Sequence, residues 1–456
     1  MTVTDTIAAI STPRGKGGIA VIRVSGADVT DILRKIFIPV GKSPAERPRY
    51  ATLGRICRGD GEVLDEGLVT FFAAPRSFTG EDVAEIACHG GLLLTETVLA
   101  AVLAAGARPA EAGEFTARAM MNGKMDLAGA EALGALLEAD TAGRLALARG
   151  GMEGRLSEAT RRCYQKLSAL LADAYAKIDF PDEDLNTMSR EALTAALVAC
   201  AGEVRALADT WQSGRAVAEG IETVICGPVN AGKSTLYNAL VGREAAIVTD
   251  IAGTTRDVLT ETVALGRLTL RLSDTAGLRN ATDAVEQIGI SRAEAALGSA
   301  ELIFAVLDGS RAPDADTNAL LARLLPMEKR VIVVLNKQDA AAVFSPETLA
   351  GFSHVVRLSA TRGEIAPLVA ETEGMFLTEG LDLRYDAVVA NARQYAALDR
   401  AAEALHLAVE ALRMDIPLDA ACIEVELAMS ALGEVDGRAV GEDIVADIFS
   451  HFCVGK

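Results

Sequence analysis

The residues best suited to chemistry are an octapeptide, GPVNAGKS, at positions 227–234. It follows a predicted strand and opens a predicted helix, residues 234–241, which Gly242 ends. Glycines let backbone N–H groups turn toward phosphate oxygens, and the helix N-terminus adds its dipole. In such a loop Lys233 would reach the β- and γ-phosphates and Ser234 would ligate magnesium. A chance glycine-rich turn fits this pattern in on the order of one chain in a hundred, so we predict a nucleotide site. The predicted contacts here are Asn230, Ala231, Gly232, Lys233, Ser234 and Thr235.

Residues 253–257, with the sequence GTTRD, follow at the distance of a first switch loop, and residues 249–252 directly precede them. Thr255 would be the second protein ligand of magnesium, drawn in only when the γ-phosphate is present. A plain threonine-rich turn is the alternative for this segment taken alone. The predicted nucleotide contacts here are Thr249, Asp250, Ile251, Ala252, Gly253, Thr254 and Thr255, while Arg256 and Asp257 join Lys233 as candidate catalytic residues.

Three more short motifs end predicted strands. They are Asp274-Thr275-Ala276-Gly277, Asn336-Lys337-Gln338-Asp339 and Ser359-Ala360. Asp274 suits a water-mediated magnesium contact, and the N–H of Gly277 suits the γ-phosphate. Asp339 can accept two hydrogen bonds from guanine N–H groups, a donor pair that adenine lacks, so it would select GTP over ATP. Ser359-Ala360 would place a backbone N–H at the guanine carbonyl. Five loops in this order make a chance origin negligible and predict an enzyme that hydrolyses GTP.

One position departs from the common small-GTPase scheme, because Leu278 follows Gly277 where a water-orienting glutamine would stand. An apolar side chain cannot polarise the attacking water. Glu286 lies twelve residues beyond Asp274 in a predicted switch helix, and we favour it for orienting water. An ordinary solvated helix residue is the alternative. Asn230 offers a neutral oxygen beside the phosphates, where a monovalent cation could replace an arginine finger.

A sheet must carry these loops, and residues 217–379 alternate apolar strands with helices. The predicted strands are residues 222–226, 259–265, 268–273, 302–307, 331–335 and 355–358. The second and third are joined by Gly266-Arg267, which predicts a hairpin. The others imply a mostly parallel, doubly wound sheet, so we expect a P-loop α/β domain of the Ras-like type.

The flanking segments differ in character. Residues 1–121 are typical of α+β structure, with predicted strands at 19–24, 50–56, 67–72 and 83–88 and a helix at 91–105. Residues 122–216 and 380–456 are rich in alanine and leucine at helical spacing, and Pro181 ends one helix after Phe180. We therefore expect a multidomain chain, with an all-α helical domain interrupted by the inserted GTPase domain. Two separate helical domains are the alternative.

Composition excludes several classes of protein. No run of eighteen apolar residues predicts a membrane span, and the N-terminus lacks a signal core, so a cytoplasmic protein is expected. Seven scattered cysteines form no Cys-x-x-Cys pair, which argues against a zinc site or a disulfide framework. The net charge of −19 does not favour broad binding to a phosphate backbone, so RNA contact would need a local patch or a partner.

The sequence resembles the MnmE (TrmE) family of bacterial tRNA-modification GTPases over the whole chain. The resemblance rests on the Asn-Ala-Gly-Lys-Ser loop, on residues 249–257 and 274–279, and on the C-terminal Phe452-Cys453-Val454-Gly455-Lys456, its most specific mark. The chain departs from the family at Val454, where isoleucine is usual, and at Pro228-Val229, where Arg-Pro is usual.

This resemblance implies a homodimer of three-part chains. Residues 1–121 would bind folate and dimerise, residues 122–216 and 380–456 would form the helical domain, and residues 217–379 the inserted GTPase domain. It implies potassium-stimulated hydrolysis with Glu286 as the catalytic acid. The positions implied for potassium are Asn230, Thr249, Ile251 and Thr254. Those implied for 5-formyl- or methylene-tetrahydrofolate are Arg23, Glu81, Lys124 and Lys456.

A partner is implied as well, the FAD protein MnmG (GidA). With it, family members add a carboxymethylaminomethyl or aminomethyl group to C5 of the wobble uridine of certain tRNAs. In this chain no Gly-x-Gly-x-x-Gly follows a strand, so any redox step must come from a partner. Cys453 is either a participant in the modification chemistry or a buried structural cysteine. Taken alone, Arg23 and Lys124 are more simply explained as surface charges.

Two other functions compete with this one. The first is a GTP-controlled assembly switch, such as a ribosome-maturation GTPase, whose usual basic RNA-binding appendage is absent here. The second is a potassium-gated dimeric scaffold whose only chemistry is GTP hydrolysis. A test of folate binding by the isolated residues 1–121 would distinguish these functions, because binding would favour tRNA modification over the assembly switch.

Overall fold

The computed structural model describes residues 5–180, 187–242, 260–273, 297–327, 330–452 and 455. They divide into two compact units, Met1–Gly134 with Asp436–Lys456, and Ala135–Val435. None of the helices in these described ranges is both long and apolar enough to cross a bilayer.

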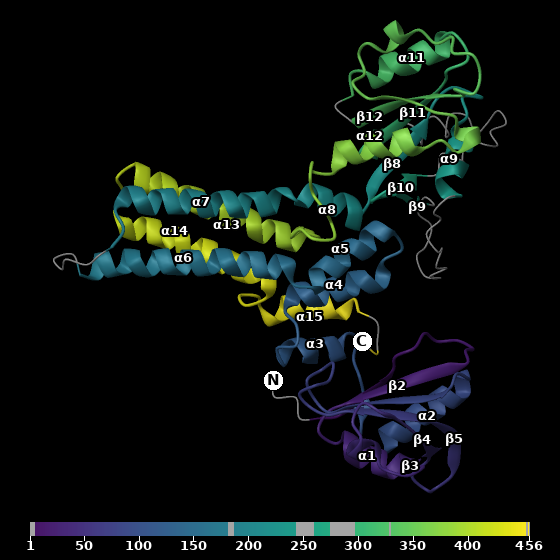
Figure 1. The fold of residues 1–456 in the computed structure, drawn as a ribbon, viewed down its shortest axis with the longest axis vertical. Helices are drawn as coiled ribbons and strands as arrows, with labels where there is room; N and C mark the ends of the chain where they lie inside the picture. Colours follow the sequence, from purple (N-terminus) through teal and green to yellow (C-terminus); the bar gives the residue numbers. More distant parts are fainter. Residues whose placement is uncertain are drawn as a thin grey trace. The chain divides into compact units, whose positions relative to one another are not determined.

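The first unit is built on a seven-stranded sheet with the order β3-β4-β5-β6-β2-β1-β7 (Figure 1). Its strands are β1 (Ile7–Ile10), β2 (Ile19–Ser25), β3 (Phe37–Pro39), β4 (Ala51–Cys57), β5 (Val63–Phe72), β6 (Val83–His89) and β7 (Arg108–Pro109). Neighbours pair antiparallel except β1 and β7, which are parallel. The four strands predicted in this segment are confirmed. The sequence misses β1, β3 and β7, because strands of four residues or fewer show too little alternation.

Side chains of this sheet alternate between two faces. The helices of the unit are α1 (Val29–Ile36), α2 (Leu92–Ala104), α3 (Glu114–Met121) and α15 (Glu442–Ser450). On one face Ile22 and Val24 of β2 pack with α1 and α2. On the other face Ile7 of β1 packs with Phe115 of α3. Because Arg23 and Ser25 alternate with Ile22 and Val24, they belong to the face that α3 covers.

Helices dominate the ends of the second unit. They are α4 (Leu127–Glu138, which begins in the first unit), α5 (Ala142–Met152), α6 (Arg155–Asp179), α7 (Arg190–Asp209), α8 (Trp211–Ala218), α13 (Ala392–Arg413) and α14 (Leu418–Asp436). In Figure 1 the long helices α6, α7, α13 and α14 lie side by side. Leu167 and Leu197 share one core with Leu405 and Leu432, so helices from before and after the inserted sheet pack together. As predicted, α6 stops at Asp179.

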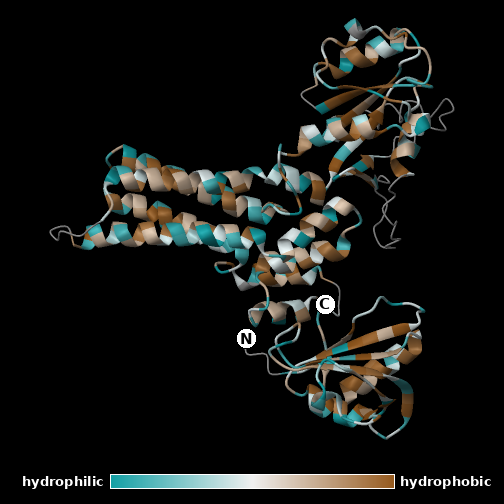
Figure 2. Cartoon of the chain, viewed as in Figure 1, coloured by the Kyte–Doolittle hydropathy of each residue, from teal (hydrophilic) through white to brown (hydrophobic). Residues whose placement is uncertain are grey.

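The inserted sheet has six strands in the order β13-β12-β11-β8-β10-β9. They are β8 (Ile221–Cys226), β9 (Thr260–Leu265), β10 (Leu268–Ser273), β11 (Leu302–Asp308), β12 (Arg330–Asn336) and β13 (Val355–Arg357). All pairs are parallel except the β9–β10 hairpin. Each strand lies within one residue of its prediction. The central strands β11 and β12 are continuous apolar runs, as expected for strands buried on both faces of a sheet. Figure 2 shows brown, hydrophobic strands in the middle of this sheet.

Several helical segments accompany this sheet, including the end of a helix at residues 297–299. The others in the described residues are α9 (Lys233–Val241), α11 (Ala315–Leu324), α12 (Ala366–Phe376) and the short turns η3 (Pro346–Leu349) and η4 (Ala360–Arg362). The multidomain architecture predicted from the sequence, with an α+β part, a helical part and an inserted Ras-like α/β part, is thereby confirmed.

Candidate functional site

The predicted phosphate loop connects the end of β8 at Cys226 to the start of α9 at Lys233. Two of its glycines are required by space and by backbone conformation. A Cβ on Gly227 would lie 2.1 Å from the carbonyl oxygen of Val306, and one on Gly232 would lie 2.1 Å from Nδ2 of Asn336. Both glycines have positive φ, 149° and 101°. The loop therefore packs tightly at the carboxyl end of the sheet, where helix α9 offers its N-terminus to an anion.

Lys233 spans this loop. Its Nζ donates to the carbonyl oxygens of Gly227 at 2.8 Å and Pro228 at 2.7 Å. Burial lowers the pKa of this ammonium, because a desolvated charge is unfavourable without a counter-ion. Ser234 is exposed on the first turn of α9, which fits a hydroxyl ligand for magnesium. Asn230 is also exposed and holds a left-handed backbone, with φ of 63°.

A second group of predicted residues forms a corner at the ends of β12 and β13, which we call the base corner: Asn336, Lys337, Asp339, Ser359 and Ala360. Asn336 is buried, and its Nδ2 donates to the carbonyl oxygen of Ala231 at 3.1 Å. Its Oδ1 accepts from the backbone N–H of Ala360 at 2.9 Å. One side chain thus ties the base corner to the phosphate loop.

A neutral hydrogen-bond donor holds the carboxylate of Asp339 in place. The hydroxyl of Ser359 donates to Oδ1 of Asp339 at 2.7 Å. This hydrogen bond lowers the pKa of Asp339, as do smaller contributions from its own backbone N–H and from nearby cations. The carboxylate is therefore ionised at neutral pH and can accept the paired N–H groups of guanine.

Sequence reasoning missed Asp308, which belongs to the same corner. Asp308 is the last residue of β11 and lies opposite Asn336 in the sheet. Its Oδ2 lies 2.7 Å from Nζ of Lys337, and its Oδ1 accepts from the backbone N–H and hydroxyl of Ser310. Burial raises the pKa of Asp308, but these contacts outweigh burial and leave the pKa below its ordinary value. A signal was present, because an aspartate at the carboxyl end of a predicted parallel strand points to the ligand edge.

Many predicted site residues lie outside the described residues, and their roles stay predictions. They are Thr249, Asp250, Ile251, Ala252, Gly253, Thr254, Thr255, Arg256, Asp257, Asp274, Thr275, Ala276, Gly277, Glu286, Cys453 and Lys456.

In the first unit, the three described candidates for folate flank one loop, residues 75–81. The guanidinium of Arg23 lies 5.3 Å from the ring centroid of Phe78. Nζ of Lys124 donates to the carbonyl oxygen of Pro75 at 2.9 Å, and a Cβ on Gly80 would meet the Lys124 side chain at 3.4 Å. Glu81 ends the loop. Residues that are far apart in sequence are thus brought to one place.

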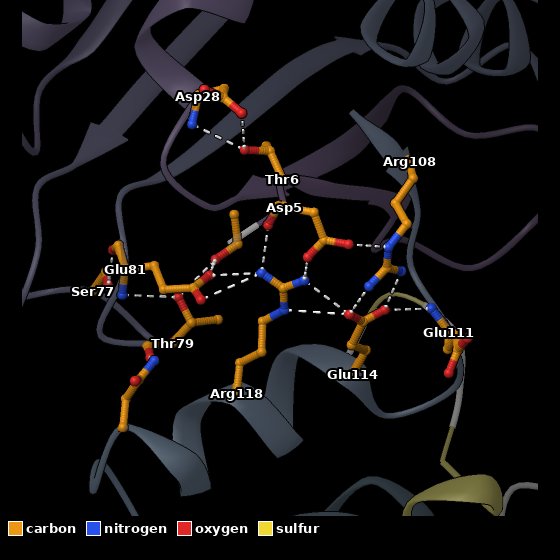
Figure 3. A network of polar contacts seen from close by, with 12 residues as sticks. Asp5, Thr6, Asp28, Ser77, Thr79, Glu81, Arg108, Glu111, Glu114 and Arg118 are labelled. Atoms are coloured by element: carbon orange, nitrogen blue, oxygen red, sulfur yellow. Dashed lines mark hydrogen bonds and ion pairs between the residues drawn. The ribbon is translucent and has the colours of Figure 1, made fainter. Parts of the chain in front are cut away.

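Figure 3 shows that Glu81 also belongs to a network centred on Arg118, which sequence reasoning missed. We call this the Arg118 network; its charged members are Asp5, Glu81, Arg108, Glu114 and Arg118. A signal for it was present in α3. Arg118 shares the buried face of that helix with Phe115 and Ala119, and a charge on an apolar face needs partners.

The chain matches two family models, GTP-binding protein TrmE N-terminus over residues 6–124 and MnmE helical domain over residues 127–453. Among curated relatives, the tRNA modification GTPase MnmE of Heliobacterium modesticaldum is 40% identical, and the alignment covers 100% of both chains. That of Chloroflexus aurantiacus is 42% identical and covers 99% of this chain and 100% of the relative.

Among solved structures, the G domain of the T. maritima FeoB iron transporter is 28% identical over 33% of this chain and 93% of that chain, with a TM-score of 0.25. The strand order and register of the inserted sheet define its fold independently of this likeness. Both family models and the full-length relatives match, and the phosphate loop is tied to the base corner through Asn336. This chain is therefore a GTPase and belongs to the family of tRNA modification GTPases named MnmE.

Proposed function

We propose that this chain is a potassium-dependent cytoplasmic GTPase that drives modification of the wobble uridine in certain tRNAs. Acting as a homodimer with an FAD-dependent partner of the MnmG (GidA) type, it promotes addition of a carboxymethylaminomethyl or aminomethyl group to C5. The observation that carries this proposal is similarity over the full length to relatives named tRNA modification GTPase. The residue ranges 1–121, 122–216 with 380–456, and 217–379 serve as its folate, helical and GTPase domains.

In the GTPase cycle, each predicted residue acts by ordinary electrostatics. The γ-phosphate replaces the two loop carbonyls as the partner of Lys233, and Ser234 and Thr255 hold magnesium. The exposed Asn230 would hold potassium beside the phosphates, and this cation would supply positive charge that offsets the charge developing in the transition state. Glu286 orients the attacking water, since Leu278 cannot. The remaining potassium contacts come from Thr249, Ile251 and Thr254.

The one-carbon donor, 5-formyl- or methylene-tetrahydrofolate, binds at the loop of residues 75–81. Two observations support this assignment: Arg23 and Lys124 place two cations beside that loop, and Glu81 places a carboxylate at its end. The cations suit the anionic glutamate tail of a folate, and the carboxylate suits N–H donors of its ring system. Lys456 completes the set.

The experiment that tests this function is mass analysis of the wobble uridine in tRNA from cells that lack the gene. Cells complemented with the wild-type chain should recover the C5 modification, and cells given Glu286→Ala should not, although that variant still binds GTP. Full modification in the deletion strain would refute the proposal. Recovery with Glu286→Ala would separate GTP hydrolysis from the modification.

The potassium requirement is tested with purified protein. GTP turnover should be faster in potassium chloride than in sodium chloride at equal ionic strength, and Asn230→Ala should remove the difference while leaving GTP affinity nearly intact. Equal turnover of the wild-type chain in the two salts would rule out the cation site.

A further inference from the structure

Arg118 is a cation with only 1% of its surface exposed. Burying a guanidinium is unfavourable unless its donors are paired. All three nitrogens of Arg118 are paired: Nη1 donates to Glu81 and to the backbone oxygen of Asp5, Nη2 to the carboxylates of Asp5 and Glu114, and Nε to Glu114. The position of this guanidinium is therefore set from three sides.

The three carboxylates of the network do not depend on Arg118 equally. Arg108 also pairs with Asp5 at 2.5 Å and with Glu114 at 2.6 Å. Hydrogen bonding to Arg108 is the main cause that lowers the pKa of Asp5. Glu81 lacks this second guanidinium, since Arg118 is its one cationic partner in the part of the chain that the structure describes. Loss of Arg118 would therefore strip the countercharge from Glu81 and leave Asp5 and Glu114 with theirs.

The contacts to Glu81 also fix its direction. Oε2 accepts from the hydroxyl of Ser25 at 2.7 Å and from Nη1 of Arg118 at 3.2 Å. Oε1 receives only the longer 3.3 Å contact from Arg118 among the described residues. The backbone is held as well, because the N–H of Glu81 donates to Thr79 and its carbonyl accepts from Ser77.

A carboxylate oxygen accepts two hydrogen bonds, so Oε1 keeps capacity for another donor. The Glu81 side chain as a whole is 18% exposed, so a ligand at the loop can reach this residue. Preorganised acceptors of this kind bind more tightly than mobile ones, because their orientation does not have to be fixed on binding.

We propose that Arg118 is a positioning residue of the folate site, an inference that rests on the folate binding proposed above. Ser25 and Arg118 hold Oε2 of Glu81, and Oε1, which Arg118 also contacts at 3.3 Å, accepts an N–H donor of the pterin ring as its second hydrogen bond. Arg118 itself does not touch the ligand. The competing explanation is that the Arg118 network serves only to fasten α3 to the sheet.

The test measures affinity of the purified full-length chain for 5-formyltetrahydrofolate by calorimetry, with thermal melting as a check on folding. The variants are Glu81→Gln, Arg118→Gln, the double variant, and Arg118→Lys. Arg108→Gln is the matched control, because it removes a cation that pairs with Asp5 and Glu114 but not with Glu81.

Glu81→Gln and Arg118→Gln should each weaken folate binding by about tenfold or more, the size of a lost hydrogen bond to a charged group. The double variant should be no weaker than Arg118→Gln, because the two residues act through one contact. Arg118→Lys keeps a positive charge beside Glu81 and should bind folate more tightly than Arg118→Gln. If Arg118→Gln does not fold, Arg118→Lys is compared with Glu81→Gln instead. Arg108→Gln should change affinity by less than about twofold.

Losses that multiply in the double variant, or an Arg108→Gln loss as large as that of Arg118→Gln, would overturn the positioning role. So would an Arg118→Lys chain that folds but binds no better than Glu81→Gln. Failure of the wild-type chain to bind folate would instead refute the proposed folate site, so the two failures are distinguishable.

Discussion

The base corner and the Arg118 network both hold a carboxylate ready for a ligand, but they do so with different donors. In the base corner, the neutral hydroxyl of Ser359 fixes Asp339 and leaves its negative charge for the ligand. In the Arg118 network, guanidinium groups fix the carboxylates and offset most of their charge. A carboxylate held by a neutral group offers a ligand its full charge, whereas one held by a cation offers mainly a directed lone pair.

The two regions also differ in how the chain assembles them. Asn336 and Ala360 lie 24 residues apart on neighbouring strand ends. Asp5 and Arg118 lie 113 residues apart and meet only through the fold of the whole sheet. The first kind of site leaves a short motif in the sequence, and the second kind does not.

The largest loss of ligand affinity is expected when the Asp339 carboxylate loses its charge. Asp339→Asn should weaken GTP binding by roughly a hundredfold or more, because two charge-assisted hydrogen bonds to guanine are lost. The new amide donor should instead favour xanthosine triphosphate, whose base has a carbonyl where guanine has its amino group. Titration calorimetry with both nucleotides measures this. Ser359→Ala, which keeps the carboxylate, is the control and should lose much less; unchanged GTP affinity in Asp339→Asn would refute the base assignment.

Asn336→Ala should come next, and it acts on stability as well as binding. It leaves the oxygen of Ala231 and the N–H of Ala360 without their buried partner, at a cost of about 1–3 kcal/mol each. Denaturant unfolding of the full chain measures the loss. Asn318→Ala, on the exposed side of α11, should change stability by less than about 0.5 kcal/mol. A similar result for both variants would mean that the Asn336 bridge contributes little.

Asp308→Asn should have a moderate effect, since its partner Lys337 is partly exposed and solvent screens the pair. Affinity should fall by about threefold to tenfold, equally for GTP and GDP, because the base corner does not contact the γ-phosphate. Asp314→Asn, at the N-cap of α11, is the matched control. A loss confined to GTP would place Asp308 at the phosphates and contradict its position here.

The smallest effect is expected on stability at low pH, where Glu114 of the Arg118 network becomes protonated. Burial raises the pKa of Glu114, but hydrogen bonds from Arg108, from the backbone of Glu111 and from Arg118 leave it below its ordinary value of 4.5. Glu114 therefore stabilises the fold above pH 4.5, and this contribution is lost as pH falls through the folded pKa. Glu114→Gln should flatten the pH dependence of the melting temperature below about pH 5, where Glu114 takes up its proton more readily in the unfolded chain than in the folded one. Glu111→Gln should keep the pH dependence of the wild-type chain. If the melting temperatures of Glu114→Gln and the wild type change equally with pH, the pKa of Glu114 is not lowered in the folded chain.

The comparison also explains what could be predicted from the sequence. The six strands of the inserted sheet and the phosphate loop were predictable because apolar runs and glycine spacing are local. Asp308 was missed because the predicted strand stopped one residue before it, at residue 307. Arg118 was missed because two of its three acidic partners, Asp5 and Glu81, come from distant segments. Its burial becomes visible only when the sheet and α3 are in place.

The central claim is that the base corner, through Asp339, accepts guanine and rejects adenine. Calorimetric titration of the wild-type chain with magnesium GTP and magnesium ATP under the same conditions tests it most directly. Saturable heat for GTP and none for ATP is the predicted result. No heat for GTP, or equal heat for the two nucleotides, would contradict it.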